Sequence, residues 1–368
     1  MLDKFIGSLI GGAAGDALGY AIEFDNEKAI EKKYGKSGIT EYELHHTGVA
    51  QFSDDTQMTL FTANGLITGY TQNRLANGND DKNGFMSYIS QAYQDWHTTQ
   101  FNLLPSHTPK CAWIGNIPAL YEMRAPGGTC LKSCYIGANG TIDDPINDQY
   151  GCGGVMRVAP IGLMFSVNDG YTIEKIDMIG AATAALTHGN PLGYMPAAIL
   201  VHVINRMVYT DMSLLDAVLE SIEFVKKLFV NSSEKTNFIN LIHKSIELAN
   251  SSLTDLSCIH ILGEGWTGDE ALAISIFCAL RHQDDFEKAI IAAVNHRGDS
   301  DSTGAITGNI LGARMGIHGI PQKFIDNLEL KDLIVEIATD LYKCTRMSTE
   351  DMIADDVWHK KYIDKTFA

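Results

Sequence analysis

Residues 5–19 read FIGSLIGGAAGDALG, and glycine recurs at every fourth position of this segment, at 7, 11, 15 and 19. Positions four apart share one face of an α-helix, so the glycines would line up along a face that lacks side chains. Such a face lets the backbone of a neighbouring helix approach unusually closely. No Gly-Lys-Ser/Thr follows, which excludes a phosphate-binding loop. The segment therefore predicts a closely packed helix at the start of the chain.

Helical periodicity continues through most of the sequence. Apolar residues recur at three- and four-residue spacing in residues 173–187, 191–209, 213–229, 236–249, 269–281, 285–295 and 301–314. The best strand candidate is the short segment Ile39–Leu44. Two polar or glycine-rich stretches, Thr71–Gly84 and Arg124–Gly154, are expected to be long loops, which are usually functional or disordered. Because no repeat or linker divides the chain, we predict one all-α domain that spans residues 1–368.

The composition excludes several classes of partner. The chain has 368 residues, with 45 acidic and 28 basic side chains and a net charge of −17. An extended nucleic-acid interface needs clustered basic residues, and so does docking on anionic lipid. No apolar run reaches the roughly 18 residues of a membrane span. We therefore expect neither nucleic acid nor a membrane as a partner.

The cysteines and the first residues favour a cytoplasmic location. The seven cysteines are odd in number and contain no Cys-x-x-Cys, so they predict neither a disulfide scaffold nor a zinc knuckle. Reduced thiols in a cytosol are the simplest interpretation. Residues 5–15 could pass for the apolar core of a signal peptide. However, a lone Lys4 beside Asp3 is a weak positive region, and Asp16 interrupts the apolar run.

Two carboxylates stand at the start of an expected helix near residue 53. Residues 52–57 read FSDDTQ and precede an apolar run. Ser53 occupies the N-cap position. Asp54 and Asp55 fall in the first turn, where the helix dipole favours negative charge. Taken alone, this pattern is typical of any well-capped, acidic helix start.

A second acidic motif precedes the last of the periodic stretches. Residues 295–304 read NHRGDSDSTG. Asp299 and Asp301 again crowd a helix N-terminus, after a glycine that permits a tight entry. An EF-hand loop would need a Glu where Ile310 stands, so that interpretation fails. On its own, this motif too is compatible with a capped acidic turn.

The two acidic motifs are more informative together. Four carboxylates that converged without a cation would repel one another and raise their pKa values. Ligand sets made only of oxygen suit hard divalent cations such as Mg²⁺ or Mn²⁺ rather than zinc. Two ions sharing such a cage would fit the two-metal pattern. Whether the two segments meet in space depends on the tertiary structure.

Three further features have an ordinary structural interpretation beside a functional one. Glu23 ends an apolar stretch, as an exposed helix-end acid would. Tyr150–Arg157 holds small residues whose free N–H groups could bind phosphate. Met156 breaks Gly-x-Gly-x-x-Gly there, which disfavours a dinucleotide fold. His188 fits a helix C-terminal turn and a ligand contact equally well.

In this order, the motifs resemble those of the ADP-ribosylglycohydrolase family. The matching stretches are Gly15–Glu23, Ser53–Thr56, Gly151–Arg157, Thr187–His188 and Gly298–Thr303. The resemblance implies a compact multi-helix, all-α fold with two divalent cations in a cleft, Mg²⁺ being favoured and Mn²⁺ second. By the family pattern, one group of metal ligands is Ser53, Asp54 and Asp55, and the other is Asp299, Asp301 and Ser302.

The resemblance also implies how the substrate is held. Glu23 matches an acid that contacts the substrate or the metal and gates the cleft. The residues that match the ADP-ribose site are Tyr150, Gly151, Cys152, Gly153 and His188. Many members have Asn where this chain has Cys152 and Thr where it has Ser302, and both departures look closer to the arginine-specific branch. Residues 71–112 match poorly, and the segment Arg124–Cys130 receives no role.

The implied activity is removal of ADP-ribose from a modified protein side chain, with arginine as the first choice. Asp55 or Glu23 would act as general base or acid in hydrolysis of the glycosidic bond. One alternative is an immunity protein that neutralises a cognate ADP-ribosyltransferase by occlusion, as well as or instead of hydrolysis. Another is a metal-dependent phosphohydrolase that cleaves the pyrophosphate. A catalytically dead relative is disfavoured because both acidic motifs are intact.

Overall fold

The computed structural model describes the chain in four stretches, residues 1–77, 84–102, 104–105 and 108–365. Helices make up nearly all the regular structure in these stretches. The other backbone pairing in them consists of two isolated bridges, Ala50 with Leu328 and Gly151 with Thr267. The predicted all-α class is therefore confirmed.

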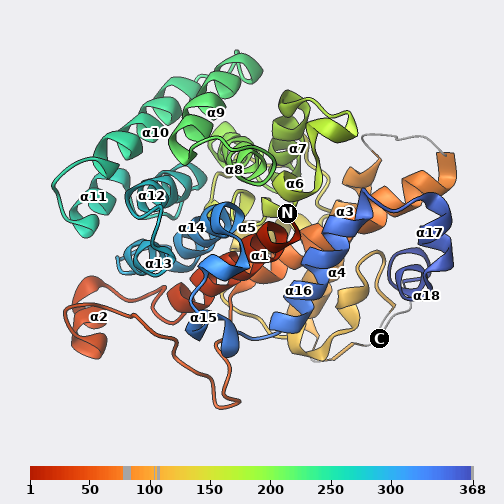
Figure 1. Cartoon of the computed structure of the whole chain (residues 1–368), viewed down its shortest axis with the longest axis horizontal. Helices are drawn as coiled ribbons and strands as arrows, with labels where there is room; N and C mark the ends of the chain where they lie inside the picture. Colours follow the sequence, from red (N-terminus) through yellow and green to blue (C-terminus); the bar gives the residue numbers. More distant parts are fainter. Residues whose placement is uncertain (78–83, 103, 106–107, 366–368) are drawn as a thin grey trace.

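The glycine-rich first helix lies at the centre of the molecule against a helix from near the C-terminus (Figure 1). These helices are α1 (Leu2–Tyr20) and α14 (Ser300–Met315). Glycines face glycines along the contact, in the pairs Gly7 with Gly312, Gly11 with Gly308 and Gly15 with Gly304. A Cβ atom added to Gly15 would lie 2.0 Å from the carbonyl oxygen of Gly304. The predicted close packing is thus confirmed, and its partner is the helix that follows the second acidic motif.

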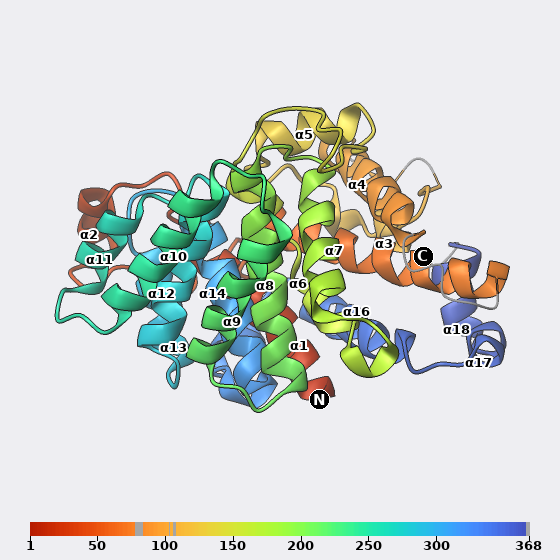
Figure 2. The same ribbon diagram turned by 90° about the horizontal axis from the view of Figure 1, so that it is seen from above.

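Two groups of helices flank this central pair (Figures 1 and 2). One group runs from α7 to α13: α7 (Ile173–Ala185), α8 (Pro191–Tyr209), α9 (Leu214–Leu228), α10 (Lys235–Ala249), α11 (Asp255–Leu262), α12 (Gly268–Arg281) and α13 (Phe286–Val294). The other comprises α3 (Asp54–Asn77), α4 (Phe85–Phe101), α16 (Lys331–Cys344), α17 (Thr349–Ala354) and α18 (Asp356–Trp358). The short helices are α2 (Glu27–Tyr34), α5 (Gly128–Tyr135), α6 (Ala159–Met164) and α15 (Lys323–Asp326).

The predicted helices are found within a few residues of their expected bounds, because apolar periodicity reports the buried face directly. The expected strand Ile39–Leu44 is wrong. This segment has no regular structure, and the backbone N–H of Ile39 donates instead to Oδ1 of Asn295, at 2.7 Å. Several further helices, among them α2, α4, α11 and α16, lie outside the predicted ranges. No helix formed by the described residues is long and apolar enough to cross a membrane, and all seven cysteines are free.

Both expected loops contain helix. In Thr71–Gly84, α3 continues to Asn77, and residues 78–83 lie outside the described part of the chain. A tertiary contact supports this extension, since the indole nitrogen of Trp358 donates to the buried hydroxyl of Thr71 at 3.3 Å. In Arg124–Gly154, helix α5 forms and buries Cys130. Polar and glycine-rich composition therefore overestimated the length of these loops.

Candidate active site

One cleft gathers the residues that the sequence singled out. Its cavity volume is about 190 Å³, and its lining includes Glu23, Asp54, Asp55, Gly151, Cys152, Gly153, His188, Asp299, Asp301 and Ser302. Both acidic motifs and the glycine-rich loop therefore meet in space. Two predicted site residues lie outside this lining. The buried Ser53 accepts the backbone N–H of Asp55 with its Oγ at 3.2 Å, and the Tyr150 side chain is about half exposed.

A buried acid on α1 holds the first acidic motif in place. One carboxylate oxygen of Asp16 accepts the backbone N–H of Ser53 at 2.8 Å. The other accepts the backbone N–H and the hydroxyl of Thr56, at 2.9 and 2.5 Å. Asp16 therefore caps α3 from a different helix, so the side chains of the first motif take their position from α1. No functional role was expected for Asp16 from the sequence, although an acid inside an apolar helix was a usable signal.

The second acidic motif is also held by α1. The Asp299 side chain caps α14 by accepting the backbone N–H of Ser302, at 3.3 Å. The hydroxyl of Ser300 donates to the carbonyl oxygen of Gly19 on α1, at 3.0 Å. A Cβ atom on Gly19 would lie 2.4 Å from the carbonyl oxygen of Ser300, so only glycine permits this approach. One helix thus positions both acidic motifs.

The convergence of these acids has a clear electrostatic consequence. Burial, and then the charge of Asp301, raises the pKa values of Asp54, Asp55 and Asp299 well above their usual range. Burial and the charge of Asp301 also raise the pKa of Glu23 to about 10. The protein alone therefore does not neutralise the negative charge of this cluster.

The cluster fits a hard divalent cation by the chemistry of its donors. Oε2 of Glu23 and Oδ2 of Asp55 are buried without a hydrogen-bond partner. Unpartnered carboxylate oxygens at a crowded negative site are suitable ligands for Mg²⁺ or Mn²⁺. Among the residues that the structure describes, no three His, Cys, Asp or Glu side chains form a ready-made metal cage.

Two glycine-bearing loops form the rest of the cleft wall. Gly127 and Gly128 line it, and a Cβ atom on either would meet nothing within 4 Å. A Cβ atom on Gly153, by contrast, would lie 2.6 Å from Sγ of Cys130. The Cys152 thiol donates to the Asp299 carboxylate at 2.6 Å, which ties the second loop to the acidic cluster. Residues 127–130 are thus part of the site, although the sequence analysis could not assign them.

A buried ion pair anchors the loop that carries Gly127 and Gly128. Arg124 makes a two-pronged contact with Glu329, and its Nη2 lies 2.9 Å from Oε1 of that residue. Its Nη2 also donates to Glu122 at 2.8 Å. The carbonyl oxygen of Arg124 accepts the backbone N–H of Asp54 at 3.1 Å, so the pair supports the first acidic motif as well.

We expect Glu329→Gln to lower the free energy of unfolding by about 2–3 kcal/mol, because it leaves a buried guanidinium partly unpaired. This loss of stability is smaller than that expected when a buried ion pair is removed completely, because Arg124 keeps its hydrogen bond to Glu122. Urea unfolding measures the change. Glu223→Gln, which breaks an exposed pair with Lys226, is the control and should change stability by less than about 0.5 kcal/mol. Equal changes in the two variants would contradict the anchoring role of Glu329.

His188 is held as a neutral hydrogen-bond donor toward the cleft. Arg157 is buried and donates to the hydroxyl oxygen of Thr187, which lies 2.8 Å from Nδ1 of His188. Because Arg157 cannot accept a hydrogen bond, the Thr187 hydroxyl can donate either to Nδ1 of His188 or to the more distant carbonyl oxygen of Ala184, at 3.5 Å. Donation to the nearer Nδ1 leaves the proton of His188 on Nε2. Burial and then the charge of Arg157 lower the pKa of His188 to about 3.

We expect His188→Gln to flatten the dependence of stability on pH. In the wild type the unfolded chain takes up a proton near the ordinary pKa of 6.5, whereas folded His188 stays neutral down to about 3. This group therefore lowers the free energy of unfolding by up to about 1.4 kcal/mol for each pH unit below 6.5. Urea unfolding between pH 7.5 and pH 5 should show the shallower slope in the variant. An unchanged slope would mean that folded His188 is protonated.

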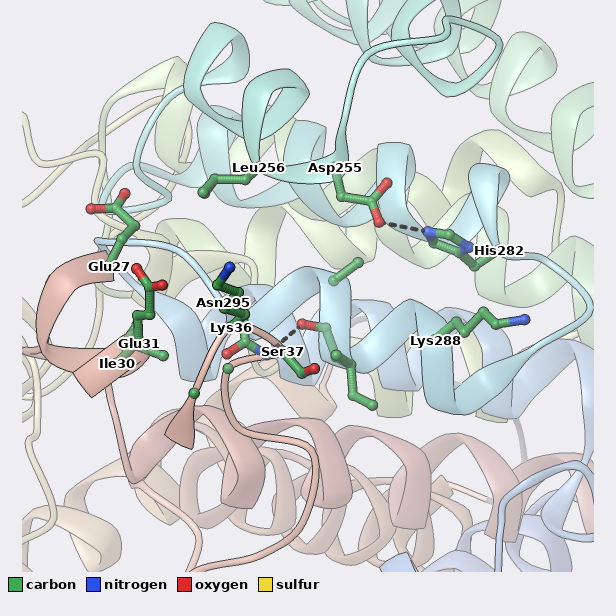
Figure 3. Close-up of a pocket in the computed structure, with 14 residues that line it drawn as sticks. Glu27, Ile30, Glu31, Lys36, Ser37, Asp255, Leu256, His282, Lys288 and Asn295 are labelled. Atoms are coloured by element: carbon green, nitrogen blue, oxygen red, sulfur yellow. Dashed lines mark hydrogen bonds and ion pairs between the residues drawn. The ribbon is translucent and has the colours of Figure 1, made fainter. Parts of the chain in front are cut away.

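A second cavity lies apart from this chemistry, between α2, α11 and α13 (Figure 3). Its wall mixes acids such as Glu31 with Lys36 and Lys288. Asp255 and His282 are hydrogen bonded to each other there, at 3.1 Å. Asn295, the first residue of the second acidic motif, lines this cavity, but Asp299 and Asp301 of that motif line the other cleft. This cavity is larger than the acidic cleft. The volume of a cavity therefore does not by itself identify the active site of this molecule.

Comparisons with known proteins bear on the identity of the whole chain. The sequence model described as ADP-ribosylglycohydrolase matches residues 1–351. ADP-ribosylhydrolase ARH3 of Danio rerio is 25% identical over 377 residues, which cover 95% of this chain and 94% of the relative. ADP-ribosyl-[dinitrogen reductase] glycohydrolase of Rhodospirillum rubrum is 24% identical and covers 89% of this chain and 91% of its own length. A solved structure titled ADP-ribosylglycohydrolase-related protein complex has a TM-score of 0.57 at 19% identity, over 94% of this chain and 98% of that one.

Proposed function

Because this chain belongs to the ADP-ribosylglycohydrolase family, we propose that it hydrolyses the glycosidic bond between ADP-ribose and a modified arginine side chain. Family membership makes it a hydrolase of ADP-ribosylated substrates, and arginine is the finer part of the proposal. The observation that carries the proposal is the meeting of five acids, Glu23, Asp54, Asp55, Asp299 and Asp301, in one cleft. An acidic cleft favours a cationic guanidinium as leaving group over a neutral hydroxyl.

Two divalent cations would be held by the acidic cluster, with Mg²⁺ as first choice and Mn²⁺ second. One group of ligands would be Ser53, Asp54 and Asp55, and the other Asp299, Asp301 and Ser302. When bound, such cations supply Lewis-acid polarisation of the ribose hydroxyls and of water. They would also offset the negative charge of the cluster, so that a diphosphate can enter.

The side chains of the cleft would then divide the remaining work. With bound cations offsetting the negative charge that raises its pKa, Asp55 or Glu23 would take a proton from the attacking water or donate one to the leaving guanidine. The water oxygen bonds to the anomeric carbon while the bond from that carbon to the guanidine nitrogen breaks, and the bonding electrons leave with the nitrogen. The guanidine takes up a proton, so free ADP-ribose and arginine are the products. Nε2–H of His188 and the backbone N–H groups of Gly151 and Gly153 would bind oxygen atoms of ADP-ribose, whereas the N–H of Cys152 is already donated to the carbonyl oxygen of Trp266.

The test is to incubate the protein with peptides that carry ADP-ribose on arginine, serine or diphthamide. Each reaction is run with Mg²⁺ and with EDTA. We expect release of intact ADP-ribose, fastest from arginine, and loss of activity in EDTA. Release of AMP would point instead to pyrophosphate cleavage, and activity that persists in EDTA would exclude the role proposed for the cations.

A further inference from the structure

Two exposed aromatic rings lie at the edge of the cleft. Phe24 directly follows Glu23, and Trp266 belongs to the cleft lining. The side chains are 76% and 40% exposed. Their ring planes are 19° apart in angle, and the ring centroids lie 6.3 Å apart. Large aromatic side chains that remain exposed beside a cleft are typical of binding surfaces.

The spacing of the rings is close to that of a clamp. A planar group held between two rings needs about 7 Å, twice the carbon–carbon contact distance of about 3.5 Å. The rings are nearly parallel, but the centroid distance includes any sideways offset between them, so Phe24 would have to move outward to admit such a group. Trp266 is the fixed side, because its carbonyl oxygen accepts the backbone N–H of Cys152 at 3.2 Å. Its neighbour Glu264 is fixed too, since its carbonyl oxygen accepts the backbone N–H of Asp299 at 2.8 Å.

The position of the clamp indicates which planar group it takes. In an ADP-ribosylated arginine, the guanidinium is attached directly to the anomeric carbon, whereas a ribose and two phosphates separate that ribose from adenine. Phe24 is next in sequence to Glu23, whose carboxylate lies in the acidic cluster where the bond would break. A group beside Phe24 is therefore the leaving group rather than the base.

The charge near these rings also suits a guanidinium, since the cleft that Trp266 lines contains Glu23 and four aspartates. Guanidinium groups stack on aromatic faces, and Trp is the strongest partner for them. Serine offers no planar cation to such a pair of rings.

We propose that Phe24 and Trp266 form an aromatic clamp for the guanidinium of the modified arginine, and so determine specificity for the acceptor side chain. This proposal rests on the proposed function, because it takes the anomeric carbon to lie at the acidic cluster. It goes beyond that function by naming two residues, Phe24 and Trp266, that would make the enzyme prefer arginine as the modified side chain.

The test compares Phe24→Leu and Trp266→Leu with the wild type. We expect kcat/KM for an arginine-linked ADP-ribosyl peptide to fall about tenfold in each variant. Activity on a serine-linked peptide and the affinity for free ADP-ribose, measured by calorimetry, should both stay within about twofold of the wild type. Tyr135→Leu is the matched control, since this exposed aromatic residue lies outside the cleft lining. Because all three side chains are exposed, the melting temperatures should not change.

Two outcomes would overturn the clamp. Full activity of both variants on the arginine-linked peptide would show that the rings do not contact the leaving group. Weaker binding of free ADP-ribose, which has adenine but no guanidinium, would show that the rings hold the base.

If the wild type hydrolyses no arginine-linked peptide, a binding measurement tests the aromatic clamp separately from the proposed activity. Trp266 is the exposed tryptophan of the chain, the other three, Trp96, Trp113 and Trp358, being buried. Its fluorescence is titrated with agmatine, a soluble guanidinium. Saturable quenching that is lost in Phe24→Leu supports the clamp even though the proposed arginine activity has failed. Absence of quenching overturns it.

Discussion

Asp55→Asn should reduce kcat for release of ADP-ribose by about 10³-fold, within the range for loss of a general acid or base. The substitution keeps the shape of the side chain and removes its charge. Oδ2 of Asp55 has no hydrogen-bond partner in the folded protein, so no protein contact is lost there. Removing one charge also relieves repulsion in the cluster. We therefore expect the metal-free variant to melt at the same temperature as the wild type or slightly higher.

The control for Asp55→Asn is Asp285→Asn. Asp285 caps α13 as an acid at a helix start, far from the cleft lining, and Asn caps helices equally well. This variant should keep full activity. Thermal melting with and without Mg²⁺ gives a second readout, since the stabilisation of the wild type by Mg²⁺ should shrink in Asp55→Asn. If Asp55→Asn retains more than about a tenth of wild-type activity, Asp55 is not the catalytic base or acid.

Gly15→Ala should lower the free energy of unfolding by about 3 kcal/mol, at the upper end of what overpacking costs. The added methyl would lie 2.0 Å from the carbonyl oxygen of Gly304, which is backbone and cannot move alone. Helices α1 and α14 would have to separate along their length. The better helix propensity of Ala, about 1 kcal/mol, does not offset this. Urea unfolding measures the loss.

Separation of the two helices should also reach the active site. Asp299 and Asp301 stand at the start of α14, so a shift of that helix moves them away from Asp55 on α3. Activity should therefore fall in Gly15→Ala even at temperatures where the variant is folded. Gly128→Ala is the control for stability, because its Cβ atom would meet nothing within 4 Å. A Gly15→Ala protein as stable as that control would show that the close helix contact is not required.

Local pattern was enough to predict many of the helices and the two acidic motifs, whereas the resemblance to a family indicated that these motifs share a cleft. Apolar periodicity repeats every three to four residues, so it can be read within one segment. The same holds for the caps and acids at Ser53–Asp55 and Asp299–Asp301, since a helix N-terminus favours hydroxyls and negative charge wherever it lies. Composition was less reliable. It predicted loops where Thr71 and Cys130 are held in helices by tertiary contacts.

What the sequence alone determined is therefore the all-α class, the glycine face of the first helix and the two acidic motifs. The tertiary structure decided that these motifs meet. On helix α1, Gly19 contacts Ser300 at the start of α14, and Asp16 caps α3, which carries Asp55. One helix therefore positions two motifs that lie far apart in the sequence. The tertiary structure also decided the roles of Arg124 and Trp266. Such contacts depend on how closely two backbones approach in space, and no local spacing in a chain encodes the partner of a helix face.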